Sequence, residues 1–372
     1  MIEGWTFDVT DAFYMQMALD LAKQAQGQTN PNPMVGAVLV KDGRIVGFGA
    51  HLRAGEPHAE VHAFRMAGEH AEGATLYVTL EPCSHHGKTP PCADLVISSK
   101  VKRVVVAMTD PNPLVAGNGI NRIREHGIEV EVGLLEAEAI ALNERFLHNM
   151  RTKRPFVVVK TAMTLDGKIA AHTGDSRWIT GPDARAAVHR LRNEVDGILV
   201  GIGTVLADDP ELTARLPEGG GKHPVRILLD TCLRIDESAK VLDTSVAPTW
   251  IVTAQGADGE KAARLRERGV QILEFAQRDL AAVLDKLYSL GITHLLVEGG
   301  ATVNGAFLQA GLIDKVMAFV APKLIGGEGA PTPYGGSGFD TMSQAVQLRD
   351  ISVTTYGDDI CITGYPVYGG EQ

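Results

Sequence analysis

Strands that alternate with helices run through this chain twice, and no other feature of the sequence limits the fold as strongly. In the first half, apolar β-rich runs such as MVGAVLV and ATLYVTL alternate with segments of helical periodicity. The pattern restarts after RTKRP at 151–155, a short basic stretch that is the best linker candidate. Such alternation is typical of a sheet with helices packed on it. The sequence therefore predicts an α/β protein with two domains, residues 1–150 and 151–372.

Local signals place several of the elements. An Asp-Gly pair between two apolar runs indicates a hairpin at Asp42-Gly43. Pro57 can open a helix that extends to about Glu69. A single helix is expected over 135–149, and the run GILVGIGT (197–204) is expected to be a strand.

The charge balance argues against one class of partner. The chain has 35 Lys and Arg against 45 Asp and Glu, a formal net charge of −10. Nonspecific nucleic-acid binding depends on clustered cations, so no nucleic-acid partner is expected. The N-terminus lacks a basic stretch followed by an apolar one, and the sequence has no run of about 18 apolar residues. We expect a cytoplasmic protein with no membrane partner.

The four cysteines stand at positions 83, 92, 232 and 361. A disulfide framework is not expected in a long chain without a secretion signal. Cys232 and Cys361 stand alone in apolar, strand-like surroundings, where cysteine serves as a small hydrophobe. We expect both to be inert buried thiols. Cys83 and Cys92 have a different setting, EPCSHHGKTPPC, with two histidines between them.

His58 and Glu60, in PHAEVHAF, combine with Cys83 and Cys92 into a set of side chains suited to zinc. Zinc binds neutral imidazole and thiolates, and three protein ligands leave a fourth tetrahedral position for water. A bound zinc ion lowers the pKa of that water to about 7. Glu60 can take a proton from the water and pass it to a leaving amine. Residues two apart do not share a helix face, so His58 and Glu60 converge over the first helical turn, a placement that Pro57 favours.

The pattern H-x-E, followed by P-C and a second cysteine, is typical of zinc-dependent nucleoside and base deaminases, and the chain resembles that superfamily. It departs in one respect, because eight residues separate the cysteines. The insertion resembles one branch, the bifunctional riboflavin-biosynthesis deaminase/reductases, whose motif T-L-E-P-C-x-H-x-G-x-T-P-P-C fits TLEPCSHHGKTPPC at 79–92. The resemblance implies a cytidine-deaminase-like three-layer α/β/α domain. In that domain Zn²⁺ is bound by His58, Cys83 and Cys92, and Glu60 is catalytic.

Other polar residues of the first half have more than one interpretation. His85 or His86 could replace a cysteine as a metal ligand. His51 or His85 could contact the substrate or be a structural residue. Asn32, in TNPNPMVG, resembles a position that lines the deaminase substrate pocket. An amide there can donate to and accept from a pyrimidinone edge, and a turn residue is the alternative interpretation.

Segments of the second half resemble the reductase of the same branch, which has a dihydrofolate-reductase-like α/β fold. These segments are KTAMTLDGKIA (160–170), SRWIT (176–180), HRLRNEVDGILVGIGTVLADDPELTAR (189–215) and LLVEGGATVNGAF (295–307). Glycines that end a strand before a helix, as in VEGG, let backbone N–H groups approach phosphate. The G-x-G-x-x-G fingerprint of a Rossmann domain is absent from the sequence.

The resemblance implies NADPH as the second cofactor. The expected cofactor contacts are Ala162, Trp178, Thr204, Asp208, Gly299 and Gly300. The expected substrate contacts are Ser176, Arg192, Leu212, Arg215, Glu298 and, in the first half, Asn32. Arg192 and Arg215 suit a ribose phosphate because a guanidinium pairs bidentately with phosphate oxygens. Lys160 or Asp166 could relay a proton beside the nicotinamide, and the sequence does not choose between them.

The resemblance favours a bifunctional enzyme of riboflavin biosynthesis that acts on a phosphorylated pyrimidine. The first half would deaminate 2,5-diamino-6-ribosylamino-4(3H)-pyrimidinone 5′-phosphate, and the second would reduce the ribosyl group to ribityl with NADPH. A homo-oligomer, either a dimer or a tetramer, is also implied.

Two rival interpretations remain open. One is a cytidine, guanine or tRNA-adenosine deaminase with an unrelated C-terminal domain, although the cysteine gap and the acidic charge speak against tRNA. The other is a zinc-stabilised binding module without catalysis. Glu60 speaks against the second, because a structural zinc site is normally closed by four ligands and needs no general base.

Overall fold

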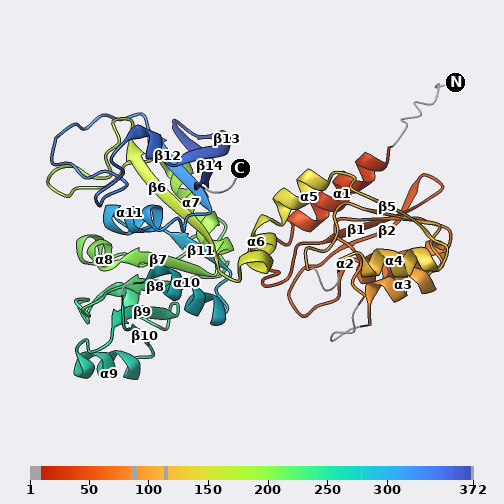
Figure 1. Cartoon of the computed structure of the whole chain (residues 1–372), viewed down its shortest axis with the longest axis horizontal. Helices are drawn as coiled ribbons and strands as arrows, with labels where there is room; N and C mark the ends of the chain where they lie inside the picture. Colours follow the sequence, from red (N-terminus) through yellow and green to blue (C-terminus); the bar gives the residue numbers. More distant parts are fainter. Residues whose placement is uncertain (1–9, 85–89, 113–115, 278, 370–372) are drawn as a thin grey trace. The chain divides into compact units, whose positions relative to one another are not determined.

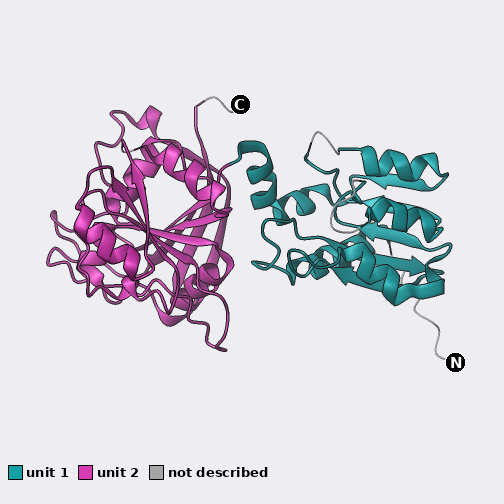
Figure 2. Ribbon diagram, turned by 90° about the horizontal axis from the view of Figure 1, so that it is seen from below, with its two compact units in different colours: residues 1–153 teal, residues 154–372 magenta. Residues whose placement is uncertain are grey.

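The computed structural model describes residues 10–84, 90–112, 116–277 and 279–369. The chain consists of two compact units, Met1–Lys153 and Arg154–Gln372 (Figure 2). The division between them lies within the basic stretch at 151–155. Each unit has its own sheet and its own apolar core. The α/β fold class predicted from the alternating pattern is confirmed for both.

The N-terminal unit is built on a five-stranded sheet. Its strands are β1 (Gly36–Lys41), β2 (Arg44–Ala50), β3 (Thr75–Val78), β4 (Arg103–Val106) and β5 (Glu129–Val132). Its α-helices are α1 (Asp11–Lys23), α2 (Ala59–Ala67), α3 (Cys92–Ser98), α4 (Asn118–Glu125), α5 (Glu136–Leu142) and α6 (Glu144–Thr152). The strand order is β2-β1-β3-β4-β5, with β3, β4 and β5 parallel. Figure 1 shows α1 and α5 on one side of the sheet and α2, α3 and α4 on the other, which makes three layers.

The hairpin predicted at Asp42-Gly43 is confirmed and joins β1 to β2. Both residues have positive φ, 50° for Asp42 and 71° for Gly43, as in the type I′ turns that match the twist of flanking strands. β1 is buried along nearly its whole length because α1 and α2 cover its two faces. Glycine is required where α1 crosses the strand, since a Cβ on Gly36 would collide with the carbonyl oxygen of Ala18.

The single helix predicted over 135–149 is wrong, because the chain turns at Asn143 between α5 and α6. The buried Asn143 side chain holds the backbone of Met34 with both of its polar atoms. Its Oδ1 accepts from the Met34 N–H at 2.8 Å, and its Nδ2 donates to the Met34 carbonyl at 3.0 Å. These long-range hydrogen bonds fix a break that helical periodicity alone does not reveal.

The C-terminal unit is built on a nine-stranded sheet. Its strands are β6 (Phe156–Thr164), β7 (Gly197–Gly201), β8 (Val225–Leu229), β9 (Thr249–Ala254), β10 (Gln271–Phe275), β11 (His294–Val297), β12 (Lys315–Ala321), β13 (Gln347–Tyr356) and β14 (Asp359–Val367). Its α-helices are α7 (Pro182–Glu194), α8 (Ile202–Asp208), α9 (Gly259–Glu267), α10 (Leu280–Ser289) and α11 (Ala301–Gln309). The strand order is β10-β9-β8-β7-β11-β6-β12-β14-β13, parallel from β10 to β12 and antiparallel beyond.

Apolar side chains alternate between two cores along the parallel strands. On β6, Val158 packs in a core that includes residues of α8 and α9, whereas Val159 packs in a second core with α10 and α11. A parallel sheet covered on both faces therefore accounts for the nearly continuous apolar runs in this half of the sequence.

The strand predicted for GILVGIGT is wrong in its second part. β7 ends at Gly201, and α8 begins at Ile202. Ile202 and Val205 are both buried, and a spacing of three residues places them on one face of a helix. The sequence patterns also miss α4 and β10, which are short elements of eight and five residues.

Candidate functional sites

His58, Cys83 and Cys92 come together in the N-terminal unit although they are far apart in the chain. His58 immediately precedes α2, Cys83 lies in the loop after β3, and Cys92 is the first residue of α3. Their ligand atoms all lie within 4.8 Å of one another. The Nδ1 atom of His58 is 3.6 Å from Cys83 Sγ and 3.3 Å from Cys92 Sγ. Both cysteines are free thiols, so no disulfide joins them.

This arrangement fits a zinc ion. Tetrahedral zinc at ~2.1 Å from nitrogen and ~2.3 Å from sulfur separates those two atoms by about 3.6 Å. The two Nδ1–Sγ distances of 3.6 and 3.3 Å are close to that value. The pKa of Cys83 is lowered because hydrogen bonds from Cys92 and His58 stabilise its thiolate. The donor set is therefore spaced as zinc requires.

Glu60 lies beside this cluster, in the first turn of α2. Its side chain is 3% exposed, and burial raises its pKa above the usual range of a carboxyl group. A raised pKa suits a group that must accept a proton and release it again near neutral pH. The helix begins at Ala59, directly after His58, so the first-turn placement expected from Pro57 is confirmed.

A chain of hydrogen bonds connects Asn32 to the region of the cluster. The Nδ1 atom of His51 lies 3.2 Å from the Pro57 carbonyl oxygen, which can only accept, so Nδ1 carries a proton. Burial lowers the pKa of His51, which keeps the ring neutral. Its Nε2 therefore accepts from Asn32 Nδ2 at 3.1 Å. The ring of His51 also meets the ring of His58 edge to face, with centroids 5.5 Å apart. His85 and His86 lie outside the described residues.

The sequence does not single out Glu81, yet its buried carboxylate organises the segment next to Cys83. One oxygen accepts from the backbone N–H groups of Asp110 and Gly117, at 3.1 and 2.9 Å. The other accepts from Gly119 and Ile120 at the start of α4, at 2.9 and 3.3 Å. This carboxylate, two residues before Cys83, ties the loop that carries Cys83 to α4.

Replacing Glu81 with glutamine is expected to lower the free energy of unfolding by roughly 1–3 kcal/mol, because an amide nitrogen cannot accept the N–H groups that it would face. Zinc retention should fall with it. Thermal unfolding and zinc content per chain measure both effects. Glu69→Gln, at an exposed position of the same unit, is the matched control. Equal stability and equal zinc content in the two variants would contradict this role for Glu81.

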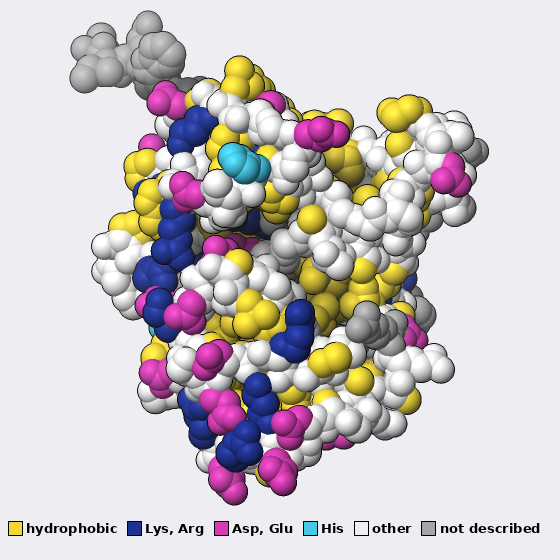
Figure 3. All heavy atoms as spheres, turned by 90° about the vertical axis from the view of Figure 1, so that its left-hand side faces the viewer, with side chains coloured by type: hydrophobic (Ala, Val, Ile, Leu, Met, Phe, Trp, Pro, Cys, Tyr) yellow, Lys and Arg dark blue, Asp and Glu magenta, His cyan; other side chains and the backbone are white. Residues whose placement is uncertain are grey.

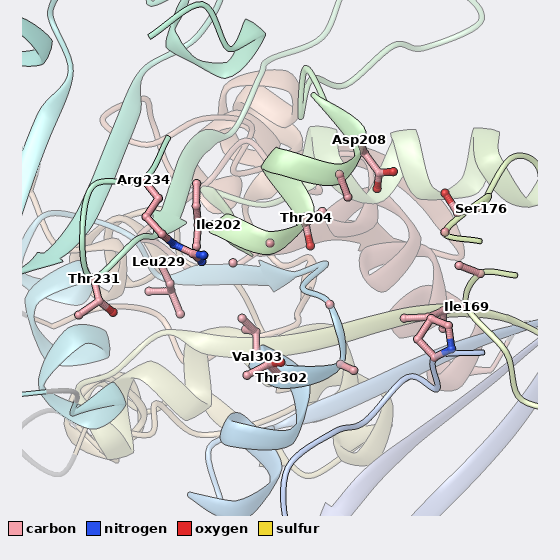
Figure 4. A pocket seen from close by; sticks show the side chains of 18 of the residues that line it. Ile169, Ser176, Ile202, Thr204, Asp208, Leu229, Thr231, Arg234, Thr302 and Val303 are labelled. Carbon is pink, nitrogen blue, oxygen red and sulfur yellow. The ribbon is translucent and has the colours of Figure 1, made fainter. Parts of the chain in front are cut away.

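In the C-terminal unit, a cavity of about 750 Å³ opens at the carboxyl ends of parallel strands. Open α/β sheets bind ligands at this edge. The strands β7, β8 and β11 end there, and α8 and α11 supply residues of the wall. Four residues predicted from the sequence line it: Ser176, Thr204, Asp208 and Gly300. Figure 4 shows Ile169 and Ser176 at one end, Thr204 near the middle, and Thr231 and Arg234 at the opposite end.

The glycines that precede α8 and α11 each face a side chain of the other helix at this cavity. A Cβ added to Gly201 would lie 2.7 Å from Val303 Cγ2, and one added to Gly300 would lie 3.4 Å from Thr204 Oγ1. Gly300 is the residue before α11, where the first N–H groups of a helix have no helical partner. Such groups suit the phosphates of a dinucleotide.

A buried ion cluster follows β11, directly before the glycines. The guanidinium of Arg192 binds both oxygens of Glu298, at 2.7 and 3.0 Å, and donates to the Thr213 carbonyl at 3.2 Å. The Nζ atom of Lys160 lies 3.6 Å from the same carboxylate. Burial works to raise the pKa of Glu298, but the charges of Arg192 and Lys160 outweigh it and lower the pKa to about 2. The structure thus joins three predicted residues into one charged unit.

Three predicted cofactor residues are not among those that line the cavity: Ala162, Trp178 and Gly299. Ala162 is half-buried on β6, on the same face as Lys160. Trp178 is 63% exposed, and the guanidinium of Arg185 lies 4.5 Å from its ring centroid.

Three further predicted residues, Leu212, Arg215 and Asp166, also lie outside the lining of the cavity. Leu212 is buried and has a φ of 52°. Arg215 is exposed and pairs with Glu211 at 2.7 Å. Asp166 accepts from Thr164 Oγ1 at 2.6 Å and from the Gly326 N–H at 2.7 Å, so its carboxylate holds a loop together.

One expectation for the cysteines is wrong. Cys361 is buried as predicted, but Cys232 is exposed and lines the cavity together with Thr231 and Arg234. These residues follow the predicted strand VRILLD, and the carboxyl end of a parallel strand is a signal that could have identified them.

Charged side chains are mixed on the face of the molecule drawn in Figure 3, where Lys and Arg are interspersed with Asp and Glu. No helix among the described residues has both the length and the apolar character needed to span a bilayer.

Two protein-family models match this chain. Residues 155–362 match the RibD C-terminal domain, and residues 8–108 match the zinc-binding region of cytidine and deoxycytidylate deaminases.

Full-length relatives extend the likeness over both units. A riboflavin biosynthesis protein RibD from Bacillus amyloliquefaciens is 51% identical over 363 residues, 97% of this chain and 98% of the relative. The solved structure of Acinetobacter baumannii RibD is 41% identical with a TM-score of 0.86, and the match covers 96% of this chain and 99% of that one. A diaminohydroxyphosphoribosylaminopyrimidine deaminase/5-amino-6-(5-phosphoribosylamino)uracil reductase from Thermotoga maritima is 40% identical with a TM-score of 0.84, covering 96% and 98%.

Proposed function

This chain belongs to the RibD family of riboflavin-biosynthesis enzymes, which join a deaminase to a reductase, and on that premise we propose which residues carry each reaction. The N-terminal unit holds the deaminase site, and the C-terminal unit holds the reductase site. The substrate is 2,5-diamino-6-ribosylamino-4(3H)-pyrimidinone 5′-phosphate. Hydrolysis of its 2-amino group releases ammonia, and reduction of the ribosyl group to ribityl follows.

In the deaminase site, His58, Cys83 and Cys92 bind zinc. Zinc held there supplies water whose pKa is low enough to yield a nucleophile near neutral pH. Glu60 would take a proton from the water and pass it to the ring nitrogen, and it would then carry the proton of the newly formed C2–OH group to the leaving amine. Its burial supports this role, because a carboxyl with a raised pKa can both accept and return a proton at neutral pH.

Asn32 orients the pyrimidinone in this proposal. The hydrogen bond from Asn32 Nδ2 to His51 Nε2 fixes which way the amide faces, because His51 is itself anchored on the Pro57 carbonyl. The Oδ1 atom of Asn32 is then presented as an acceptor for an N–H edge of the base. His51 acts by positioning Asn32.

In the reductase site, bound NADPH would supply the hydride that reduces C1′ of the opened sugar. Thr204, Asp208 and Gly300 contact the cofactor from the cavity wall, and Ala162, Trp178 and Gly299 complete the proposed contact set. Lys160 is the better candidate for the proton relay, because Asp166 already binds Thr164 and the Gly326 backbone. Lys160 lies within the buried cluster beside Glu298.

The same site must hold a phosphorylated substrate. Ser176, Leu212 and Glu298 complete the proposed substrate contacts, with the backbone of Leu212 available because its side chain is buried. Arg215 is exposed and suits the phosphate. Arg192 fixes the orientation of Glu298 through its bidentate pair and keeps further N–H donors for the substrate.

The observation that carries the deaminase assignment is the convergence of one imidazole, two thiols and a buried carboxyl from separate elements. Removing zinc with a chelator is expected to abolish ammonia release from the diaminopyrimidinone, because the metal generates the nucleophile. NADPH oxidation with the deaminated intermediate should be unchanged, and added zinc should restore ammonia release.

Ammonia release by the metal-free protein would contradict the zinc assignment. A parallel loss of NADPH oxidation would contradict the separation of the sites. Ammonia release from cytidine or deoxycytidylate, but not from the diaminopyrimidinone, would retain the zinc chemistry and overturn the substrate.

The homo-oligomeric state, as a dimer or tetramer, and the cytoplasmic location stay predictions. Sedimentation equilibrium of the purified chain distinguishes a dimer from a tetramer and from a monomer.

A further inference from the structure

The segment 176–180 carries two proposed contacts of the reductase site but has no regular structure of its own. Ser176 lines the cavity, and Trp178 is a proposed cofactor contact. These five residues belong to no helix or strand, so no ladder of backbone hydrogen bonds fixes their position. The partners of their carbonyl groups have to come from side chains or from water.

Two cations bind three successive carbonyl groups of this segment. The Nζ atom of Lys323 donates to the carbonyl oxygens of Trp178 and Ile179, at 2.7 Å each. Arg185, near the start of α7, donates to the Thr180 carbonyl oxygen at 2.7 Å. Hydrogen bonds from a charged donor are stronger than those between neutral groups. The backbone of the segment is therefore held from two separate elements.

Arg185 also fixes the indole ring of Trp178. Its guanidinium carbon lies over the ring, 4.5 Å from the centroid, which is a cation–π contact. The residue is nevertheless 63% exposed, so much of the ring stays accessible to a ligand. An aromatic ring that is already immobilised loses little conformational freedom when a planar group packs on it.

Lys323 stands on a turn that is itself anchored. It follows the end of β12 by two residues. Its own carbonyl oxygen accepts from the Leu165 N–H at 2.8 Å, in the loop after β6. The N–H groups of Ile325 and Gly326 donate to the carboxylate of Asp166 in the same loop, at 3.3 and 2.7 Å. A cation on such a turn can set the position of the segment that it binds.

We propose that Lys323 and Arg185 are positioning residues of the reductase, which hold Trp178 in the place where it receives NADPH. Both act through Trp178. This assignment rests on the proposed reductase function, in which Trp178 contacts the cofactor. A role in folding alone would change the free energy of unfolding but not the affinity for NADPH of the folded protein.

Steady-state reduction of the deaminated intermediate tests the role of Lys323. Lys323→Met keeps a side chain of similar length and removes the charge and the N–H donors. KM for NADPH is expected to rise about 5- to 30-fold, the loss of charge-assisted hydrogen bonds, while kcat with saturating NADPH should stay near the wild-type value. Lys323→Arg should recover part of the loss, because a guanidinium also donates to carbonyl oxygens. Lys286→Met, at an exposed position of α10, is the matched control.

A double-mutant cycle shows whether the two cations act through Trp178. Trp178→Ala alone should raise KM for NADPH. In that background Lys323→Met should add little, because substitutions within one contacting unit are not additive. Arg185→Met should depend on Trp178 in the same way.

A wild-type KM for NADPH in Lys323→Met would overturn the inference, and so would a rise of equal size with and without the Trp178 ring. An unchanged KM in Trp178→Ala would instead overturn the proposed cofactor contact. Failure of wild type to oxidise NADPH with the deaminated intermediate would overturn the proposed function. The failures are thus distinguishable in one set of assays.

Discussion

Glu60→Gln lowers the rate of ammonia release from the diaminopyrimidinone by at least about 10²–10⁴-fold, the usual contribution of a positioned general acid–base group. Glutamine has nearly the same shape as glutamate but cannot carry a proton from the water to the leaving amine. The substitution should be tolerated by the fold, because Glu60 is buried and the neutral amide removes a charge that burial disfavours. Coupled detection of ammonia measures the effect.

Zinc content separates loss of chemistry from loss of the metal. Glu60→Gln should retain as much zinc as wild type, since His58, Cys83 and Cys92 remain in place. Glu56→Gln, at an exposed position just before α2, should keep wild-type ammonia release. A Glu60→Gln variant that holds zinc and still releases ammonia at the wild-type rate would exclude Glu60 as the proton carrier.

Arg192→Ala destabilises the C-terminal unit by roughly 3–5 kcal/mol, because it leaves the Glu298 carboxylate buried without its bidentate partner. The side chains of Arg192 and Glu298 are 14% and 9% exposed, so water cannot replace the lost hydrogen bonds well. Lys160 remains 3.6 Å from the carboxylate, and it offsets part of the loss. Denaturant unfolding of the whole chain measures the effect in the transition of this unit.

The same ion cluster makes stability depend on pH. The folded pKa of Glu298 is about 2, below the value of about 4.3 for an unperturbed glutamate. The cluster therefore contributes its full stability above the unfolded pKa and loses it as pH falls from about 4.3 toward 2. Arg192→Ala should make the free energy of unfolding less dependent on pH in this range.

Arg266→Ala is the control. It breaks an exposed pair with Glu274, should lower the free energy of unfolding by under about 1 kcal/mol and should leave its pH profile unchanged. An Arg192→Ala profile like that of Arg266→Ala would contradict the argument.

The cluster of His58, Cys83 and Cys92 could be predicted because its residues belong to short sequence motifs. His58 and Glu60 are two positions apart, and Cys83 and Cys92 belong to one fourteen-residue motif. Only the approach of the two segments depends on the fold, and the sheet brings the ends of β3 and the starts of α2 and α3 together. Glu81, by contrast, acts through backbone groups that follow it by about thirty to forty positions, and no spacing rule points to such partners.

In the C-terminal unit, sequence patterns identify individual residues but do not predict which of them contact one another. The sequence marks Arg192, Glu298 and Lys160 separately, but their meeting in one buried cluster depends on the order β7-β11-β6 and on α7. Cys232 was expected to be buried because its neighbours are apolar, yet the strand ends at Leu229 and the next residues turn into the cavity. A short apolar run does not distinguish a strand from a helix. For this reason the sequence predicts a strand through 197–204, where the structure has the end of β7 and the start of α8.

Irregular features are set by tertiary hydrogen bonds. The apolar periodicity predicts one helix over 135–149, but the chain turns at Asn143, because the amide of this residue binds the backbone of Met34. The turn at Asp42-Gly43, whose signal is local, was predictable for the opposite reason.

NADPH oxidation by Glu60→Gln, measured with two substrates in parallel, tests most directly whether two separate sites act in sequence. Given the deaminated intermediate, this variant should oxidise NADPH at the wild-type rate. Given the diaminopyrimidinone, it should oxidise almost none, because the reductase site receives no deaminated substrate. Loss of oxidation with both substrates, or full oxidation with both, would contradict the assignment of one reaction to each unit.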